Sequence, residues 1–479
     1  MSAPANVKAT KFRWTITSML FFATTINYLD RQVLSLTWTD HIQPEFHWTN
    51  TDYGDITAIF SLVYAIAMLF AGRIIDWMDT KKGFLWFIFI WSIGACLHAF
   101  AGIGTSGIIA NEWGISFEGA REVIGKITDT ARVITVSVSL FIFARVILAI
   151  GEAGNFPAAI KATAEYFPKK DRAFATSIFN AGATIGALLA PLTIPVIANA
   201  YGWELSFIII GALGFIWMFF WVFVYKKPHV HPKVNEQELN YIQQDYTAEE
   251  ITAGNTKQSV SFFKTLGYKQ TWAFAIGKFM TDGVWWFFLF WTPAYLKSVY
   301  NLDSMASRPH IFTLYAITLL SIIGGWLPTF FVNKKGMNPY AGRMKAMLIF
   351  AFFPLLALLA QPLGSYSVWL PVVIIGIAGA AHQSWSANIF STVGDMFPKK
   401  AIATVTGIGG MAGGLGSYLI NKGSGVLFDH SKNTNMQFMG FEGIESGYFI
   451  IFSICAVAYL IGWVIMRSLV PKYSPITDL

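Results

Sequence analysis

The four residues Phe167-Pro168-Lys169-Lys170 recur as Phe397-Pro398-Lys399-Lys400, 230 residues later in the chain. A lysine pair repeats in the same order, first as Lys81-Lys82 and then as Lys334-Lys335. The offset of this second pair is larger, and residues 104–131 form a stretch of the first half that has no long counterpart in the second. The sequence therefore predicts two halves that repeat one another, with an insertion in the first.

The composition indicates that both halves lie in a membrane. Of the 479 residues, 54% are hydrophobic and only 13% are charged, which is more apolar and less charged than a soluble protein. One membrane-spanning helix needs roughly 20 apolar residues, and twelve such runs can be placed along the chain. The predicted fold is an all-α membrane protein, with twelve transmembrane helices in two pseudo-symmetric six-helix halves. We expect residues 1–225 to form the N-terminal bundle, with 104–131 as an extra outside segment, 226–270 a cytoplasmic linker, and 271–479 the C-terminal bundle.

The net charge of +7 is explained by topology. The lysine pairs above and most other cations fall in segments that share one side of the membrane with both termini, and the positive-inside rule makes that side cytoplasmic.

Other classes of function are not supported. Nucleic-acid binding would need a solvent-facing basic stripe, and no long basic run occurs outside the loops. The two cysteines lie far apart in apolar runs, so we expect no metal and no cofactor. The linker has no nucleophile constellation, so we expect no enzyme; its acids, Glu236, Glu238, Asp245, Glu249 and Glu250, are typical of a solvated helix.

Six charged residues fall inside predicted spans: Asp30, Arg31, Arg145, Glu152, Lys278 and Asp282. Charges at this depth are costly and mark either function or mutual neutralisation that permits packing. Asp30 and Arg31 point about 100° apart on a helix and cannot satisfy each other. Arg145 and Glu152 are two turns apart on one face, and a pair between them requires extended side chains. Lys278 and Asp282 have i, i+4 spacing, which suits a local ion pair as well as substrate binding.

Several motifs resemble the major facilitator superfamily. One motif is Asn27-Tyr28-Leu29-Asp30-Arg31 in the first span. Another is Gly72 followed by Asp76, Lys81 and Lys82, at the turn between the second and third spans. This turn departs from the pattern of the superfamily, because Trp77 and Asp79 stand where a basic residue and a glycine are usual. The stretch from Arg145 through Glu152 to Asn155-Phe156-Pro157, with Ser177 to Gly182, is similar to the anion:cation symporter family within it. Ala381-His382-Gln383 before Asp395-Met396-Phe397 resembles hexuronate transporters.

The resemblance implies that Arg31 grips a substrate carboxylate, for which its planar fork is suited, and that Glu152 is the principal coupling acid. Protonation of Glu152 or Asp30 would release Arg145 and leave the site electropositive. A fixed ion pair remains the alternative for Asp30. The 230-residue offset places His382 opposite Glu152, as a substrate donor or a packing residue. Lys278 and the following residues are the other candidate substrate contacts: Tyr28, Tyr64, Asn180, Gln383, Ser384, Ser386, Asn388 and Trp286.

These features predict a proton-coupled symporter that imports a sugar-acid anion by alternating access, with a hexuronate (glucuronate or galacturonate) as the substrate. An aldonate symporter for galactonate or gluconate and an exchanger of organic anions or phosphates are the alternatives, and sodium is the alternative coupling ion. We expect a monomeric, multi-pass protein of the bacterial inner membrane.

Overall fold

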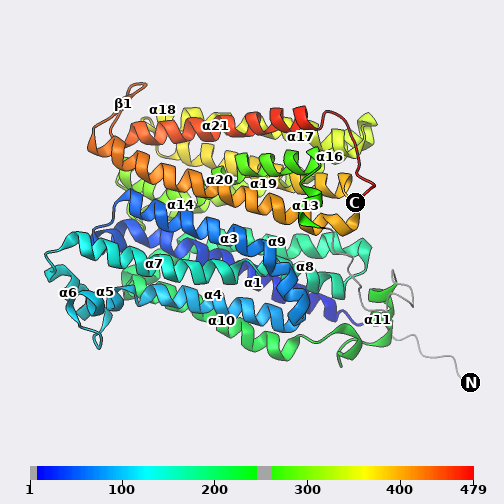
Figure 1. The fold of residues 1–479 in the computed structure, drawn as a ribbon, viewed down its shortest axis with the longest axis horizontal. Helices are drawn as coiled ribbons and strands as arrows, with labels where there is room; N and C mark the ends of the chain where they lie inside the picture. Colours follow the sequence, from blue (N-terminus) through cyan, green and yellow to red (C-terminus); the bar gives the residue numbers. More distant parts are fainter. Residues whose placement is uncertain (1–7, 245–260) are drawn as a thin grey trace, which may run out of the picture.

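The computed structural model describes residues 8–244 and 261–479, and these residues form two helical bundles side by side (Figure 1). The bundle drawn in blue to green contains α1 (Phe12–Thr37), η1, a π-helical turn (Trp38–Ile42), α2 (Gln43–Phe46), α3 (Asn50–Met78), α4 (Thr80–Ala99), α5 (Ala101–Ala110), α6 (Phe117–Lys126), α7 (Thr130–Glu152), α8 (Asn155–Tyr166), α9 (Lys169–Tyr201) and α10 (Trp203–Val224). A short 3-10 turn, η2 (Pro228–Val230), and α11 (Glu236–Gln243) follow.

The second bundle repeats this plan. It contains α13 (Phe262–Thr265), α14 (Lys269–Tyr300), α15 (Arg308–Thr318), η3 (Leu319–Ser321), α16 (Ile322–Lys335), α17 (Pro339–Phe352), η4 (Phe353–Leu359), α18 (Ala360–Gly364), α19 (Trp369–Met396), α20 (Lys399–Asn433), β1 (Gln437–Phe438), β2 (Phe441–Glu442) and α21 (Ile444–Leu469). The repeated Phe-Pro-Lys-Lys motif marks equivalent points in the two bundles. Both α9 and α20 begin directly after its proline, because proline cannot donate a backbone hydrogen bond and suits the position before a helix.

The helices of the described residues account for twelve membrane crossings, six in each bundle. Eight crossings are long and apolar enough by composition alone. The other four, α1, α14, α19 and α20, have 26, 32, 28 and 35 residues and are long enough to cross, but they do not qualify on apolar composition alone. Polar residues at membrane depth face protein or a functional site rather than lipid, so the polar side chains of these helices, and Arg145 and Glu152 on α7, are candidates for function.

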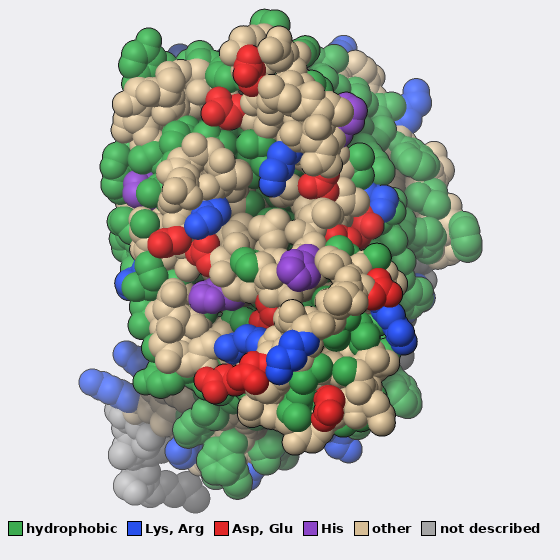
Figure 2. All heavy atoms as spheres, turned by 90° about the vertical axis from the view of Figure 1, so that its left-hand side faces the viewer, with side chains coloured by type: hydrophobic (Ala, Val, Ile, Leu, Met, Phe, Trp, Pro, Cys, Tyr) green, Lys and Arg blue, Asp and Glu red, His purple; other side chains and the backbone are tan. Residues whose placement is uncertain are grey.

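The two ends of the molecule differ. The helices α5 and α6 and the β1–β2 hairpin lie at one end, which we call the α6 end, and the start of α1 and the C-terminus lie at the other (Figure 1). Figure 2 looks onto the α6 end, where charged and histidine side chains lie across the middle of the face and hydrophobic side chains gather at its margins. The insertion predicted at 104–131 thus contains one helix, α6, and most of another, α5, which is apolar.

Helix α20 forms the seam between the bundles because its glycines allow close approach. It packs against α3 of the first bundle on one face and α14 of its own bundle on another. A Cβ atom built on Gly414 would lie 2.2 Å from the Cβ of Ala65 on α3, and one on Gly416 would lie 2.0 Å from the carbonyl oxygen of Phe279 on α14. Neither position has room for a side chain.

Polar contacts fasten the two bundles together at the α6 end. Asp429 of α20 accepts hydrogen bonds from the backbone nitrogens of Asn50 (3.0 Å) and Thr51 (2.6 Å) and from Asn50 Nδ2 (2.8 Å), at the start of α3. Asp40 of η1 contacts Lys297 Nζ at 3.2 Å and accepts from the backbone nitrogen of Ser304 at 2.5 Å. Lys422 lies 2.6 Å from Asp55. These contacts close the α6 end.

At the opposite end, the linker is more firmly packed than its acidic sequence suggests. Glu238 of α11 is fully buried, and its carboxylate accepts from the backbone nitrogens of Phe12 and Arg13, from Arg13 Nη1 and from Thr10 Oγ1. A carboxylate at a helix N-terminus satisfies donors that have no partner within the helix. The expectation of a solvated helix is therefore wrong for Glu238, whereas Asp245, Glu249 and Glu250 lie outside the described residues.

The turn between α3 and α4 explains why a glycine is usual at position 79. Asp79 has φ 74° and ψ 151°, a conformation that glycine adopts readily and other residues rarely do. Its carboxylate accepts from the Thr80 backbone nitrogen at 2.7 Å and lies 3.4 Å from Lys227 Nζ. These interactions offset part of the backbone strain.

Candidate functional site

The first element of the site is a buried ion pair between α1 and α7. Arg31 Nε lies 2.5 Å from Glu152 Oε2, and the two side chains are 4% and 0% exposed. Glu152 is the last residue of α7, and the chain resumes as α8 after Ala153 and Gly154. A Cβ on Gly154 would lie 2.0 Å from the ring of Phe87, so this break in the helix is closely packed. The expected partner of Glu152 was Arg145, and the structure instead brings it to Arg31, 121 residues away in sequence.

Aromatic rings from both bundles surround the Arg31 guanidinium. Its central carbon lies 4.7 Å from the ring centroid of Tyr64, 5.1 Å from that of Tyr28 and 5.2 Å from that of Trp286. Rings at this distance attract a cation through their negative faces. Since Trp286 lies on α14 and the others on α1 and α3, the guanidinium sits where the two bundles meet.

Two further charges lie beside this pair without a complementary contact. Both carboxylate oxygens of Asp30 are buried and have no hydrogen-bond partner among the described residues. The same holds for Nε and Nη1 of Arg145, whose guanidinium lies 5.2 Å from the ring centroid of Phe60. The structure does not show the fixed ion pair considered for Asp30. Buried polar atoms without partners are rare in native proteins and call for a functional explanation.

The C-terminal bundle contributes a second charged pair. Lys278 Nζ lies 2.7 Å from Asp282 Oδ2 on the same helix, α14, which confirms the local ion pair expected from i, i+4 spacing. The ammonium is also 4.2 Å from the ring centroid of Phe390. A Cβ on Gly413 would lie 2.2 Å from Asp282 Oδ2, so α20 leaves space for this carboxylate only because glycine stands there.

His382 is held in a fixed orientation by two neighbours, Trp285 and Tyr459. Its ring stacks on Trp285 with a centroid distance of 5.4 Å and an interplanar angle of 4°. Nδ1 lies 2.7 Å from the hydroxyl of Tyr459, whose oxygen is 3.4 Å from the backbone oxygen of Thr281. Nδ1 is thus occupied within the protein, and the imidazole can engage a ligand only through Nε2.

The remaining candidates divide by their contacts. Asn388 Nδ2 donates to the backbone oxygens of Gly324 and Ser384, and Ser384 Oγ donates to that of Ala380. Their donors are committed to helix packing. Gln383 and Ser386 are half-buried on α19, and Asn180 is exposed on α9.

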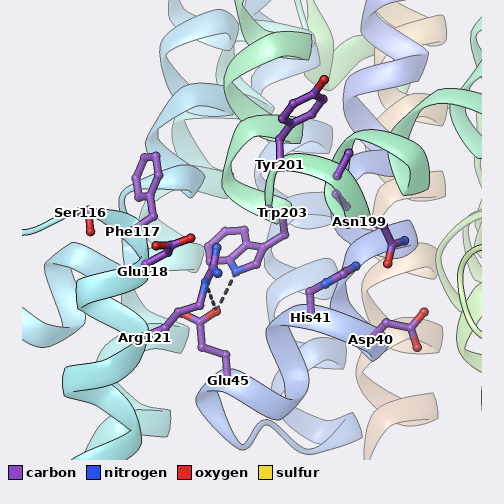
Figure 3. Close-up of a pocket in the computed structure, with 13 residues that line it drawn as sticks. Asp40, His41, Glu45, Ser116, Phe117, Glu118, Arg121, Asn199, Tyr201 and Trp203 are labelled. Atoms are coloured by element: carbon purple, nitrogen blue, oxygen red, sulfur yellow. Dashed lines mark hydrogen bonds and ion pairs between the residues drawn. The ribbon is translucent and has the colours of Figure 1, made fainter.

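A cavity of about 670 Å³ lies elsewhere, at the α6 end, among η1, α2, α6 and the α9–α10 turn (Figure 3). Its lining includes Glu45, Arg121 and Trp203 and none of the central charges. The described residues contain no group of three or more His, Cys, Asp or Glu side chains suited to a metal. The central arrangement instead suits exchange of an ion pair: a proton on Glu152 would leave the Arg31 guanidinium free for another anion.

A profile of the Major Facilitator Superfamily matches residues 20–420. The chain belongs to this superfamily. It is similar to the hexuronate transporter of Escherichia coli (strain K12), with 27% identity over 466 residues that cover 95% of this chain and 94% of that protein. It is also similar to the galacturonate transporter of Dickeya chrysanthemi, with 29% identity over 333 residues, 69% and 86% of the two chains. A solved bacterial homologue of the human lysosomal transporter Spinster, inward-facing and unoccupied, shares the fold with a TM-score of 0.65, 18% identity and coverage of 98% and 100%.

The superfamily assignment confirms the predicted fold class, and this carrier is a membrane transporter rather than an enzyme. The sequence reasoning missed three residues that shape the central site: Tyr459, Phe60 and Phe390. Tyr459 carries a hydroxyl in a mostly apolar span, and this was its only signal. Phenylalanines that face cations cannot be told from core phenylalanines without the fold.

Proposed function

We propose that this carrier imports a sugar-acid anion, specifically a hexuronate, by proton-coupled symport. The relatives named above suggest the substrate class, and the Arg31–Glu152 pair carries the mechanistic argument. We further propose that both termini are cytoplasmic, that the α6 end faces outward across a bacterial inner membrane, and that residues 1–225 and 271–479 move as two bodies joined by 226–270.

The coupling follows from competition for one guanidinium. With Glu152 ionised, Arg31 already has a carboxylate partner and a second anion would have to displace it. Protonation of Glu152 removes that partner and leaves a buried cation, ringed by Tyr28, Tyr64 and Trp286, that needs a new anion. Breaking a buried ion pair is unfavourable by roughly 3–5 kcal/mol, so a substrate carboxylate that restores it binds better to the protonated carrier. By linkage, the proton also binds better when substrate is present.

The sugar part of the substrate would lie between this pair and the C-terminal bundle. Trp286 reaches Arg31 from α14, the helix that also carries Lys278 and Asp282. His382 Nε2 and the half-buried Gln383 and Ser386 are the donors and acceptors that we assign to hydroxyl groups. Asp30 and Arg145 lie next to the Arg31–Glu152 pair, and their charges change how readily Glu152 takes up a proton. Asp30 is the second proton acceptor of this central site.

Uptake into proteoliposomes with imposed pH and sodium gradients tests the proposal. We expect glucuronate or galacturonate to accumulate when the α6 end is acidic, and Glu152→Gln to retain exchange of substrate down its gradient while losing proton-driven accumulation. Glu152→Asp is the matched control, since it keeps a carboxyl group. Accumulation of aldonates or organic phosphates alone, or unchanged concentrative uptake by Glu152→Gln, would refute the substrate or the coupling acid respectively.

A further inference from the structure

At the cavity of the α6 end, Glu45 of its lining and the adjacent Glu204 share one guanidinium, that of Arg121. Arg121 of α6 donates through Nε and Nη2 to both oxygens of Glu204, at 3.2, 2.8 and 2.6 Å. Glu45 Oε2 is only 3.5 Å from Arg121 Nε and accepts a hydrogen bond from Trp203 Nε1 at 2.7 Å. Figure 3 shows Glu45, Arg121 and Trp203 pointing toward one another. The donors of Arg121 are therefore used mainly by Glu204.

The other oxygen of Glu45 has no such donor. Oε1 is buried and has no hydrogen-bond partner among the described residues, and the Glu45 side chain is 8% exposed. A Cβ built on Gly102 of α5 would lie 3.4 Å from Oε1 and 3.8 Å from the Cβ of Ala120 on α6. The start of α5 thus covers this oxygen, with Ala120 of α6 packed close by, and an ionised carboxylate there lacks both water and a protein donor, which is costly.

The charges around Glu45 come from three elements and do not balance it. η1 contributes Asp40 and His41, α6 contributes Arg121 and Glu118, and α10 contributes Glu204. The neighbouring α5 and α7 contribute uncharged residues, Gly102 and Phe141. Burial lowers the pKa of His41, so it adds no positive charge near neutrality. Burial and then the negative charge of Glu204 raise the pKa of Glu45 to about 7, against the opposing effects of the Trp203 hydrogen bond and Arg121.

We propose that Glu45 is a second proton-binding site of the carrier, separate from the central charges, and that its proton holds the insertion helix α6 in place at the α6 end. Protonation removes the unpaired charge and leaves Arg121 and Glu204 as a balanced pair. Loss of the proton favours lifting of α6, because water can then reach Oε1. Besides the Arg121 contacts, α6 buries only two side chains, Ala120 and Ile124, and the ring of Phe117 lies 5.8 Å from that of Phe100.

The sign of the pH dependence follows from linkage. Glu45 binds its proton more tightly when α6 is docked than when it is exposed at the ordinary carboxyl pKa of 4.5. The docked state is therefore fully favoured below pH 4.5, loses that advantage progressively as the pH rises, and has lost it above about 7. The orientation proposed above makes this the pH outside the cell, beside the contact of Asp40 with Lys297 that joins the bundles.

Two single-cysteine variants on α6 test the proposal without any substrate. In a Cys96→Ala/Cys455→Ala background, Ile124→Cys places a thiol at a position that is 1% exposed, and Gly125→Cys places one at the adjacent exposed position. The ratio of their alkylation rates in the purified protein cancels the ionisation of an ordinary thiol. We expect this ratio to rise with pH from 4.5 and to level off above about 7, with an upper limit of about 300-fold set by a pKa change from 4.5 to about 7.

In Glu45→Gln, the ratio of alkylation rates should be low and should not rise with pH. Glu118 is an exposed acid of the same cavity, and Glu118→Gln should keep the rise. A ratio that does not change with pH in the parent protein, or one that still rises in Glu45→Gln, overturns the proposal. A second measurement guards against misfolded cysteine variants. The thermal midpoint of Glu45→Gln relative to the unmodified protein should increase as the pH rises from 4.5 to about 7 and should then level off, and a pH-independent difference also overturns the proposal. Neither result depends on which substrate is transported.

Discussion

Replacing Asp429 with alanine should shift the carrier toward opening at the α6 end. The carboxylate accepts three hydrogen bonds from Asn50 and Thr51, at 2.6–3.0 Å, across the boundary between the bundles. A hydrogen bond to a charged group contributes about 1.5–3 kcal/mol, and a carboxylate at a helix N-terminus adds about 0.3–1 kcal/mol. The three bonds share one part-exposed carboxylate and are not additive, so we expect a total of about 2–4 kcal/mol. That corresponds to a change of about 30-fold to about 1,000-fold in the ratio of closed to open carrier.

Distance measurements between spin labels read this ratio directly. Labels at Arg132→Cys on α7 and Asn433→Cys on α20 lie on different bundles near the α6 end, and both positions are exposed. In Asp429→Ala, the distance distribution should gain a longer component. Asp52→Ala is the matched control, because Asp52 caps α3 through Thr49 within one bundle; it should lower stability without the longer component. An unchanged distribution in Asp429→Ala would show that this cap does not hold the bundles together.

Three further predictions concern single positions. Gly202→Ala should lower the thermal midpoint, because Gly202 has φ +93° and a Cβ there would lie 2.8 Å from both Arg121 Nη2 and Glu204 Oε2; Gly125→Ala, on the exposed face of α6 with no atom within 4 Å, should not lower it. Asp79→Ala should lower the thermal midpoint more than Asp79→Gly does. Both variants lose the hydrogen bond to the Thr80 backbone, but only glycine relieves the backbone strain, which is worth roughly 1–3 kcal/mol. Equal midpoints would show that the backbone at Asp79 is not strained. Tyr459→Phe removes the partner of His382 Nδ1 but keeps the ring, and should raise the half-saturating substrate concentration about 2- to 10-fold in uptake assays; an unchanged value would mean that this hydrogen bond does not orient His382 for substrate.

The sequence predicts the fold well because the signals are local. Apolar runs report crossing helices through their length, and the motif at 167–170 and 397–400 marks the start of α9 and of α20. The i, i+4 spacing of Lys278 and Asp282 likewise specifies a contact within one helix. Each inference needs only neighbouring residues and helix geometry.

The Arg31–Glu152 ion pair could not be predicted from local sequence. Arg145 and Arg31 are both plausible partners of Glu152 by charge, and only the packing of α1 against the break after α7 selects Arg31. The aromatic ring around Arg31 draws on α1, α3 and α14, which are separated by long stretches of chain. Such contacts follow from tertiary arrangement, and no periodicity encodes them.

Two of the three charged residues at the Glu45 site lie outside the predicted spans. Glu45 follows the first span and Arg121 lies in the insertion, whose role the sequence left open, whereas Glu204 is the second residue of α10. The linker carried a similar surprise, because Glu238 was one acid of a polar run and is buried at the start of α1. Loop acids acquire partners only when distant segments fold onto them.

The glycine faces of α20 bear on how quickly the carrier can turn over. Where Gly414 meets Ala65, the two bundles touch through small side chains, and nearby Ser417 of α20 donates a hydrogen bond to Ser61 of α3. If the bundles slide along this surface, little repacking is required. The energetic barrier to the conformational change would then come mainly from the contacts of Asp429, Asp40 and Asp55 at the α6 end. We therefore expect transport to be slower when the carboxylate contacts at the α6 end are strengthened, and to be blocked by a single bulky residue at Gly414.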